Sequence, residues 1–182
     1  MANTKLGNIT AATIIGLCAA FPTPNDNTIC ESVISPVENP MCPKKKSVEI
    51  PNKYAHIVRD LAEKYEIDQN LIAAVIKQES HWKPDAKNAR TQCKGLMQLK
   101  DETAADMAKK IGMKNYNVFD AATNIELGTA YLKWLKSRDS INTVEDVLTA
   151  YNWGYGNFLK RSKALPKETR NYVKNITESM GL

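Results

Sequence analysis

Residues 71–82 read Leu71-Ile72-Ala73-Ala74-Val75-Ile76-Lys77-Gln78-Glu79-Ser80-His81-Trp82, a strongly apolar run with a carboxylic acid near its end. Such a run predicts a buried helix that continues towards Trp82. Ile72, Ile76 and Glu79 stand at i, i+4 and i+7, so they share one helix face. We therefore expect the carboxyl of Glu79 to continue the stripe that faces the core.

Glu79 is the first candidate for a functional group. Burial disfavours its anion, and the negative end of the helix dipole does the same, so both raise the pKa of the carboxyl. A carboxyl that stays protonated near neutral pH can protonate the leaving oxygen of a glycosidic bond. The alternative is an ordinary solvated glutamate where a helix frays.

The rest of the chain from Asn52 onwards also has helical periodicity, and long runs of alternating apolar residues are absent. This predicts a predominantly α domain, with a loop or small β-hairpin at 83–94, where Pro84 and polar residues gather. The expected helices are one through Tyr54, Ile57, Val58 and Leu61; one capped by Asp68; one through Ala104, Met107 and Ile111 that stops at Gly112; one from the cap Asp120 to Leu135; one opened by the capping box Thr143-Val144-Glu145-Asp146 and broken by Gly154 and Gly156; and one from about 167 to 180.

The N-terminal part has a different composition. Lys5 and the uncharged run from Ile9 to Ala20 are typical of a secretion signal, although an N-terminal helix docked on the domain is the alternative. Prolines then recur without helical periodicity up to residue 52. We expect a signal peptide at 1–20, a Pro-rich linker at 21–52 and a helical domain at 53–182, in a protein exported to the periplasm or cell envelope, or secreted.

The four cysteines fit export without fixing a pairing. Removal of a signal would leave Cys30, Cys42 and Cys93. Either Cys30 pairs with Cys42 and Cys93 is left over, or Cys93 tethers the tail to the domain. No Cys/His spacing suggests zinc and only two histidines are present, so we expect neither a metal site nor a cofactor.

The bulk composition is that of a soluble globular protein. The 182 residues are 43% hydrophobic and 25% charged, with a net charge of +5. This charge could favour an anionic partner such as cell-wall polymer, nucleic acid or phospholipid, or it could simply keep the protein soluble. A basic helix face and a recognition motif are missing, so we do not expect nucleic-acid binding.

Four short segments carry the strongest functional signal. They are Glu79-Ser80-His81-Trp82-Lys83-Pro84-Asp85-Ala86, Gly95-Leu96-Met97-Gln98-Leu99, Ala150-Tyr151-Asn152-Trp153-Gly154 and Glu168-Thr169-Arg170-Asn171-Tyr172-Val173. In this order and spacing they resemble the catalytic domain of the soluble lytic transglycosylases, a lysozyme-like family that includes relatives of goose-type lysozyme. The spacer Asn124-Ile125-Glu126-Leu127-Gly128 matches the family's helix between the second and third segments. The resemblance covers roughly residues 53–180 and implies a lysozyme-like fold.

The resemblance also implies roles for single residues. Glu79 matches the catalytic acid/base. The residues that match substrate-binding positions are Ser80, Met97, Gln98, Tyr151, Asn152 and Tyr172. Gln98 would offer its amide to an N-acetyl group, and the hydroxyl of Tyr172 would lie near the acid.

One loop departs from the family pattern. The family usually has a serine and then Gly-Ala between the acid and Gly-Leu-Met-Gln, whereas this chain has Lys87-Asn88-Ala89-Arg90-Thr91-Gln92-Cys93-Lys94. Thr91 is a candidate to stand in for the serine.

The expected reaction is cleavage of the MurNAc-β-1,4-GlcNAc bond of peptidoglycan glycan strands. Glu79 would protonate the linking oxygen and then accept the proton of the C6 hydroxyl as it closes a 1,6-anhydro ring. No second carboxylate stands in the motifs where the partner of a glycosidase acid would be expected, which agrees with a single acid/base. The alternatives are a lysozyme-type muramidase on the same fold and a wall-binding accessory protein. We expect a monomer, with a secretion, conjugation or pilus apparatus as a candidate partner.

Overall fold

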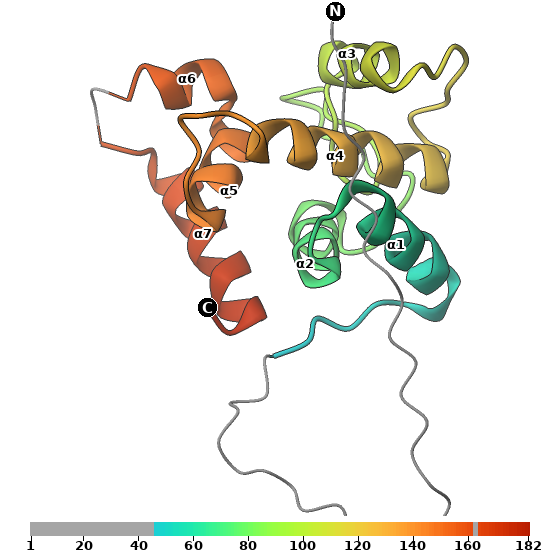
Figure 1. Ribbon diagram of the computed structural model, residues 1–182, viewed down its shortest axis with the longest axis horizontal. Helices are drawn as coiled ribbons and strands as arrows, with labels where there is room; N and C mark the ends of the chain where they lie inside the picture. The colour runs from blue at the N-terminus through green and yellow to red at the C-terminus, as the bar shows by residue number, and fades with distance from the viewer. Residues whose placement is uncertain (1–45, 162–163) are drawn as a thin grey trace, which may run out of the picture. The chain divides into compact units, whose positions relative to one another are not determined.

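The computed structural model describes residues 46–161 and 164–182, which belong to one compact unit, Cys42–Leu182. The expected signal peptide, and Cys18, Cys30 and Cys42, lie outside the described residues. Figure 1 shows the helices of the described part, which are α1 (Asn52–Tyr65), α2 (Gln69–Ser80), α3 (Asp101–Ile111), α4 (Ala121–Lys136), α5 (Val144–Trp153), α6 (Tyr155–Leu159) and α7 (Lys167–Met180). None of these helices is both long and apolar enough to cross a membrane.

The helix ends follow the signals in the sequence. The side chain of Asp68 accepts a hydrogen bond from the Asn70 N–H, and Asp120 accepts one from Thr123 at 2.9 Å. Thr143 and Asp146 form the expected capping box at the start of α5. Each of these contacts satisfies an N–H group that the helix itself leaves without a partner. Three predicted helix starts are thereby confirmed.

One expected helix boundary is wrong. Gly156 does not break a helix but lies inside α6, and the chain turns at Gly154 alone, where φ is +91°. The helix capped by Asp68 ends at Ser80, because His81 and Trp82 both have left-handed backbone conformations, and Glu79 lies in its last turn as expected. Trp82 instead stacks on Tyr54 of α1 with 5.6 Å between ring centroids.

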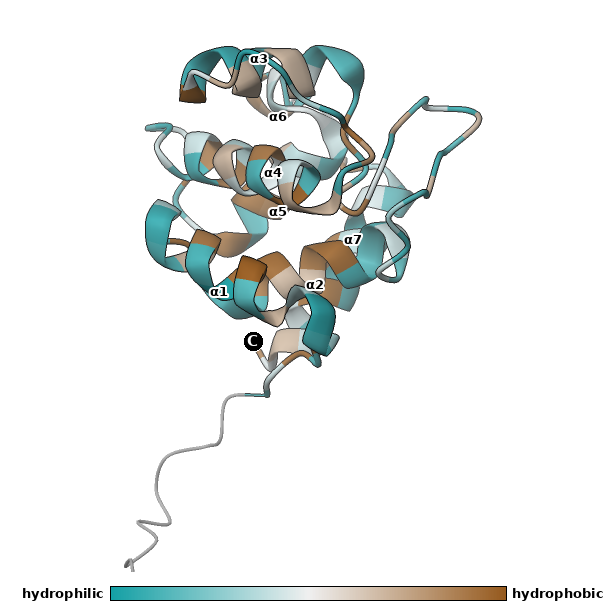
Figure 2. Cartoon of the chain, turned by 90° about the vertical axis from the view of Figure 1, so that its right-hand side faces the viewer, coloured by the Kyte–Doolittle hydropathy of each residue, from teal (hydrophilic) through white to brown (hydrophobic). Residues whose placement is uncertain are grey.

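The core forms where the apolar faces of the helices meet. α2 supplies its most buried part, since Ile72, Val75 and Ile76 are fully buried. α2 packs on α1 and α7, and α4 packs on α1, α3 and α5. In Figure 2 hydrophobic colouring gathers on the helix faces turned towards one another. The predominantly α fold class is therefore confirmed.

Residues 83–99 form an irregular connection rather than a sheet. In the described residues the only β pairing here is two isolated bridges, from Lys94 to Lys87 and to Leu99. This agrees with the loop or small hairpin predicted for 83–94.

Residues 46–51, which lie in the expected linker, pack against the helices. Val48 is only 7% exposed and belongs to the core, and its N–H donates to the Asn70 side chain at 3.2 Å. The packed part of the chain therefore begins before residue 53.

Candidate active site

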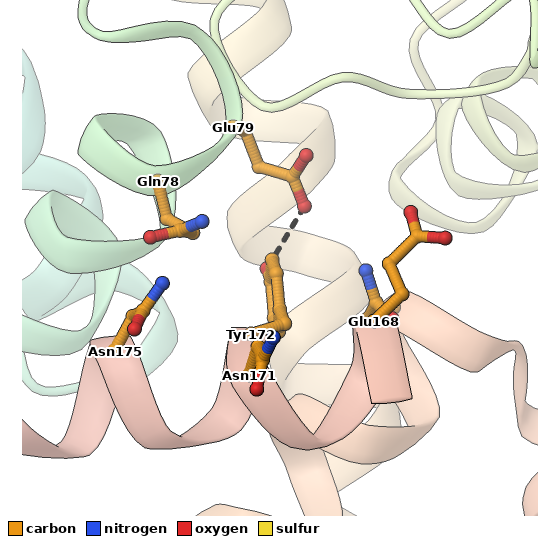
Figure 3. Close-up of a pocket in the computed structure, with 7 residues that line it drawn as sticks. Gln78, Glu79, Glu168, Asn171, Tyr172 and Asn175 are labelled. Atoms are coloured by element: carbon orange, nitrogen blue, oxygen red, sulfur yellow. Dashed lines mark hydrogen bonds between the residues drawn. The ribbon is translucent and has the colours of Figure 1, made fainter. Parts of the chain in front are cut away.

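Glu79 lies in the last turn of α2, where its half-buried carboxyl meets α7. The Tyr172 hydroxyl donates a hydrogen bond to Glu79 Oε1 at 2.8 Å, as Figure 3 shows. Burial raises the pKa of Glu79 to about 7, although the hydrogen bond from Tyr172 works in the opposite direction. The raised pKa predicted for this carboxyl is confirmed with burial as its cause, while the contribution of the helix dipole stays a prediction.

Two cavities meet at Glu79. The larger has a volume of about 400 Å³ and extends towards residues 88–103, and the smaller has a volume of about 310 Å³ and lies between α2 and α7. Both are lined by Glu79, Asn152 and Glu168. The carboxyl of Glu79 therefore stands where two halves of one groove join.

Tyr151 ties the groove wall to the 95–99 turn. Its hydroxyl donates to the Met97 carbonyl at 2.8 Å, and the residue lines the larger cavity. The side chain of Met97 is fully buried and packs against Gly128 so closely that a Cβ there would lie 2.2 Å from Met97 Sδ. The structure thus places Met97 in the core, where its contribution to the groove is a carbonyl that holds Tyr151.

Gln98 lines the larger cavity from a left-handed backbone conformation with φ of +46°. Its Nε2 donates to the carbonyls of Ala86 and Gly95 at 3.1 and 2.9 Å. Among the described residues nothing donates to its Oε1. The amide is therefore oriented to accept a hydrogen bond from a ligand.

The other predicted site residues divide into two groups. Asn152 and Tyr172 face the groove, and both line the smaller cavity. Ser80 is buried, and its hydroxyl donates back to the Ile76 carbonyl at 3.1 Å. Ser80 thus serves the end of α2 and does not line either cavity.

Asn124 positions the second motif, a role that the sequence reasoning missed. This fully buried side chain accepts from the Met97 N–H at 2.7 Å and donates to the carbonyls of Lys94 and Val118. Gly95, with φ of +77°, passes so close that a Cβ there would lie 2.2 Å from Asn124 Nδ2. The Asn124 side chain and the bare Gly95 backbone fit together, and this contact fixes the turn that carries Gln98.

Glu168 of the fourth segment is a second carboxylate in the groove, where the sequence analysis expected none in a partner position. It opens α7 and lines both cavities, with its side chain 75% exposed and 3.6 Å from the Arg90 guanidinium. Sequence could have predicted this position, because Glu168 and Tyr172 stand at i and i+4 and so share one face of the last helix.

The divergent loop contributes to the groove as well. Asn88, Thr91 and Cys93 all line the larger cavity. The Asn88 side chain accepts the N–H groups of Arg90 and Thr91 at 3.0 and 3.1 Å, which holds the turn. In the described part of the chain, no cluster of three or more His, Cys, Asp or Glu side chains has a geometry that would hold a metal ion.

A helical domain with a half-buried carboxyl of raised pKa at the centre of an open polar groove defines a lysozyme-like class of carbohydrate-active domain. Comparison with known proteins narrows this class. The family model described as Transglycosylase SLT domain matches residues 56–173. The chain belongs to this transglycosylase family.

Its relatives include proteins named membrane-bound lytic murein transglycosylase C. That of Yersinia enterocolitica is 32% identical over 136 residues and that of Shigella sonnei is 37% identical over 137 residues. Each alignment covers 69% of this chain and 38% of the relative. The chain therefore spans well under half the length of these relatives.

Solved structures of the same kind share the fold. An inactive mutant of the lytic transglycosylase Slt from Pseudomonas aeruginosa aligns with a TM-score of 0.61 and 28% identity, over 70% of this chain and 23% of the other. The 70 kDa soluble lytic transglycosylase of Escherichia coli aligns with a TM-score of 0.60 and 30% identity, over 69% of this chain and 23% of the other.

Proposed function

We propose that this chain is a peptidoglycan lytic transglycosylase that cleaves the MurNAc-β-1,4-GlcNAc bond and leaves a 1,6-anhydro-MurNAc end. The observation that carries the proposal is the carboxyl of Glu79, whose pKa is raised to about 7 by burial where the two groove halves meet. Membership of the transglycosylase family supports it.

Glu79 acts first as an acid and then as a base. Because Oε1 accepts the Tyr172 hydroxyl, the proton of the neutral carboxyl belongs on Oε2. Oε2 protonates the oxygen that links the two sugars, and the bond from this oxygen to C1 breaks. The carboxylate then accepts the proton of the C6 hydroxyl as its oxygen bonds to C1. The proton balance closes, and water is not consumed.

The groove residues hold the substrate around this carboxyl. Gln98 Oε1 accepts a hydrogen bond from an acetamido N–H, and Thr91 supplies the hydroxyl that the family usually takes from a serine. Asn152 contacts the sugars on both sides of the cleaved bond, because it lines both cavities. Met97 and Ser80 act indirectly, through the Tyr151 hydroxyl and the end of α2.

A muramidase is the second candidate, and Glu168 is the observation that favours it. A carboxylate in the groove could activate a water that replaces the C6 hydroxyl, as in inverting glycosidases. Glu168 is largely exposed and ion-paired with Arg90, which suits a binding role better than that of a catalytic base. A wall-binding accessory protein without activity is the third candidate, and the raised pKa of Glu79 speaks against it.

The mass of the products tests the proposal. Purified sacculi are incubated with the protein, and the released muropeptides are analysed by mass spectrometry. Ring closure gives products that are one water lighter than those of hydrolysis. Products carrying the added water would make the chain a muramidase, and release of no product above the level seen with Glu79→Gln would favour the accessory protein.

We propose that the protein works outside the cytoplasm, in the periplasm or cell envelope, as a monomer. The run Ile9–Ala20 supports export, and the relatives named above are described as membrane-bound. A secretion, conjugation or pilus apparatus is the candidate partner. N-terminal sequencing of the native protein, combined with a count of free thiols, tests cleavage at 1–20 and the pairing of Cys30 with Cys42.

A further inference from the structure

Arg90 and Glu168 connect the two sides of the larger cavity. Asn88 and Thr91 line this cavity from the 87–94 loop, and Glu168 lines it from the first turn of α7. Nη2 of Arg90 lies 3.6 Å from Oε2 of Glu168. Because Arg90 itself lines neither cavity, this ion pair crosses the groove at its rim and not on its floor.

The ion pair stands beside the junction of the two cavities. Glu168 and Glu79 each line both of them. Figure 3 shows the carboxylate of Glu168 extending from α7 on the side of the helix where Glu79 lies. A strand that reaches across Glu79 from one cavity into the other must therefore pass the contact between Arg90 and Glu168.

The backbone on both sides of this contact is held in place. The Asn88 side chain accepts the Arg90 N–H at 3.0 Å, and the Asn88 N–H donates to the Cys93 carbonyl at 2.9 Å, which closes the turn that carries Arg90. On α7, the residue after Glu168 is the buried Thr169. The side chains of Arg90 and Glu168 are 79% and 75% exposed, so they can separate while both walls of the groove keep their shape.

An ion pair between two exposed side chains is weak and depends on salt. Such a pair favours its closed form only a few-fold at low ionic strength, because water screens the charges and two long side chains lose freedom. Dissolved salt removes most of the remaining attraction. The contact can therefore oppose the entry of a strand without preventing it.

We infer that Arg90 and Glu168 form an ionic latch, which closes the groove rim in the free protein and opens when a glycan strand enters. This inference rests on the proposed function. The latch lowers the apparent affinity for a strand by the fraction of molecules in which it is open. This reduction is about 2- to 5-fold at low salt and disappears when salt screens the two charges. Arg90 thereby controls entry into a groove that it does not line.

Salt-dependent binding of an uncharged ligand tests the latch. In the Glu79→Gln protein, the affinity for chitohexaose, a neutral N-acetylglucosamine oligomer, should rise about 2- to 5-fold between about 0.01 M and about 1 M NaCl, where screening lengths are about 30 and 3 Å. Addition of Arg90→Gln should raise the low-salt affinity by the same factor and remove the salt dependence. Arg59→Gln is the matched control, because Arg59 forms an exposed ion pair with Asp60 and lines neither cavity.

Exchange of the two charges tests the pair itself. Arg90→Glu places two carboxylates opposite each other and should remove the rise in affinity with salt. Arg90→Glu combined with Glu168→Arg should restore this rise, because the opposite charges face each other again. Since Glu168 also lies along the strand, the readout is the change of affinity with salt and not the affinity itself.

Failure of the latch and failure of the proposed function give different results. An affinity that does not change with salt, equal effects of Arg90→Gln and Arg59→Gln, or absence of chitohexaose binding would each overturn the latch. Weaker binding by Arg90→Gln would overturn it too, because Arg90 would then be a ligand contact. The reaction is judged separately, from the muropeptide masses that the wild-type protein releases from sacculi.

Discussion

The Asn124 side chain accepts the Met97 N–H at 2.7 Å, so a buried amide on α4 holds the turn that carries Gln98. The same amide group donates to the carbonyls of Lys94 and Val118. Three backbone groups, two from the 94–99 turn and one from the segment before α4, thus share one side chain. The groove wall depends on a residue that never touches the groove.

Replacement of Asn124 should therefore affect both stability and activity. Asn124→Ala leaves the Met97 N–H and the Val118 carbonyl without a partner, whereas the Lys94 carbonyl keeps the Leu99 N–H, so the substitution should cost about 2 kcal/mol or more. Chemical denaturation measures this loss, and Asn115→Ala is the control, because Asn115 is exposed. A loss below about 1 kcal/mol would contradict the positioning role.

Glu79→Gln should remove the acid and keep the fold. General acid catalysis contributes ~10²- to 10⁴-fold, so clearance of sacculi should fall by at least that factor. Gln keeps an oxygen that can accept the Tyr172 hydroxyl. Turbidity clearance at the wild-type rate would refute the assignment of Glu79.

The same substitution should stabilise the protein at high pH. Because the pKa of Glu79 in the folded state, about 7, lies above the value of 4.5 for an unperturbed Glu, wild-type stability falls as pH rises from 4.5 and the loss is complete above 7. Glu79→Gln lacks this loss, so its advantage should grow from near zero at pH 4 to about 3 kcal/mol at pH 8. Denaturant unfolding at the two pH values checks it, and an equal advantage at both would show that burial does not raise the pKa.

Tyr172→Phe should shift the pH profile of kcat/KM to higher pH. The hydrogen bond from Tyr172 favours the carboxylate, so its loss raises the pKa of Glu79 further. The high-pH limb of kcat/KM, which reports loss of the protonated acid, should shift to higher pH. Tyr116→Phe is the control, since Tyr116 is 38% exposed and lines neither cavity. A limb that stays in place or moves down would show that the bond does not act on the acid.

Glu168→Gln separates the two candidate reactions. A lytic transglycosylase should still release anhydro products, at a lower rate, because Glu168 only helps to hold the strand. A muramidase that uses Glu168 as its base should lose product almost entirely. The masses and amounts of the released muropeptides, compared with those from wild-type protein, decide between the two.

Val48→Ala tests whether residues before 53 belong to the folded unit. Deletion of two buried methyl groups should lower the free energy of unfolding by about 1 to 2 kcal/mol. Glu49→Ala, at the exposed neighbouring position, should change it by less than about 0.5 kcal/mol. Equal effects of the two substitutions would place Val48 outside the core.

The helices and the acid were predictable because local rules determine them. Asp68, Asp120 and the Thr143 box mark helix starts through contacts within a few residues, and the position of Glu79 follows from one helix period. The burial of Val48 was not predictable, because a single apolar residue in a Pro-rich segment has no periodicity that would indicate a buried face. The stacking of Trp82 on Tyr54 was not predictable either, because it joins residues that are 28 positions apart in the chain.

The sequence predicts which residues belong to the candidate site better than it predicts how their side-chain atoms are arranged. The motifs name Gln98, Tyr151 and Tyr172, but sequence cannot tell which atoms of a side chain are already engaged. The Gln98 amide nitrogen is bound to backbone carbonyls, and the Met97 side chain is buried. The sequence analysis missed the amide side chains of Gln78 and Asn175 beside Glu79, because these two residues come together only when α2 packs on α7.

The stack of Trp82 on Tyr54 has a consequence for the acid three residues earlier. Glu79 can keep its proton near neutral pH only while the last turn of α2 stays closed over it. Trp82, two residues after the end of α2, stacks on Tyr54 of α1, and this contact opposes fraying of the helix end. The stack of Trp82 on Tyr54 therefore helps to keep the pKa of Glu79 raised, although neither ring lines the groove.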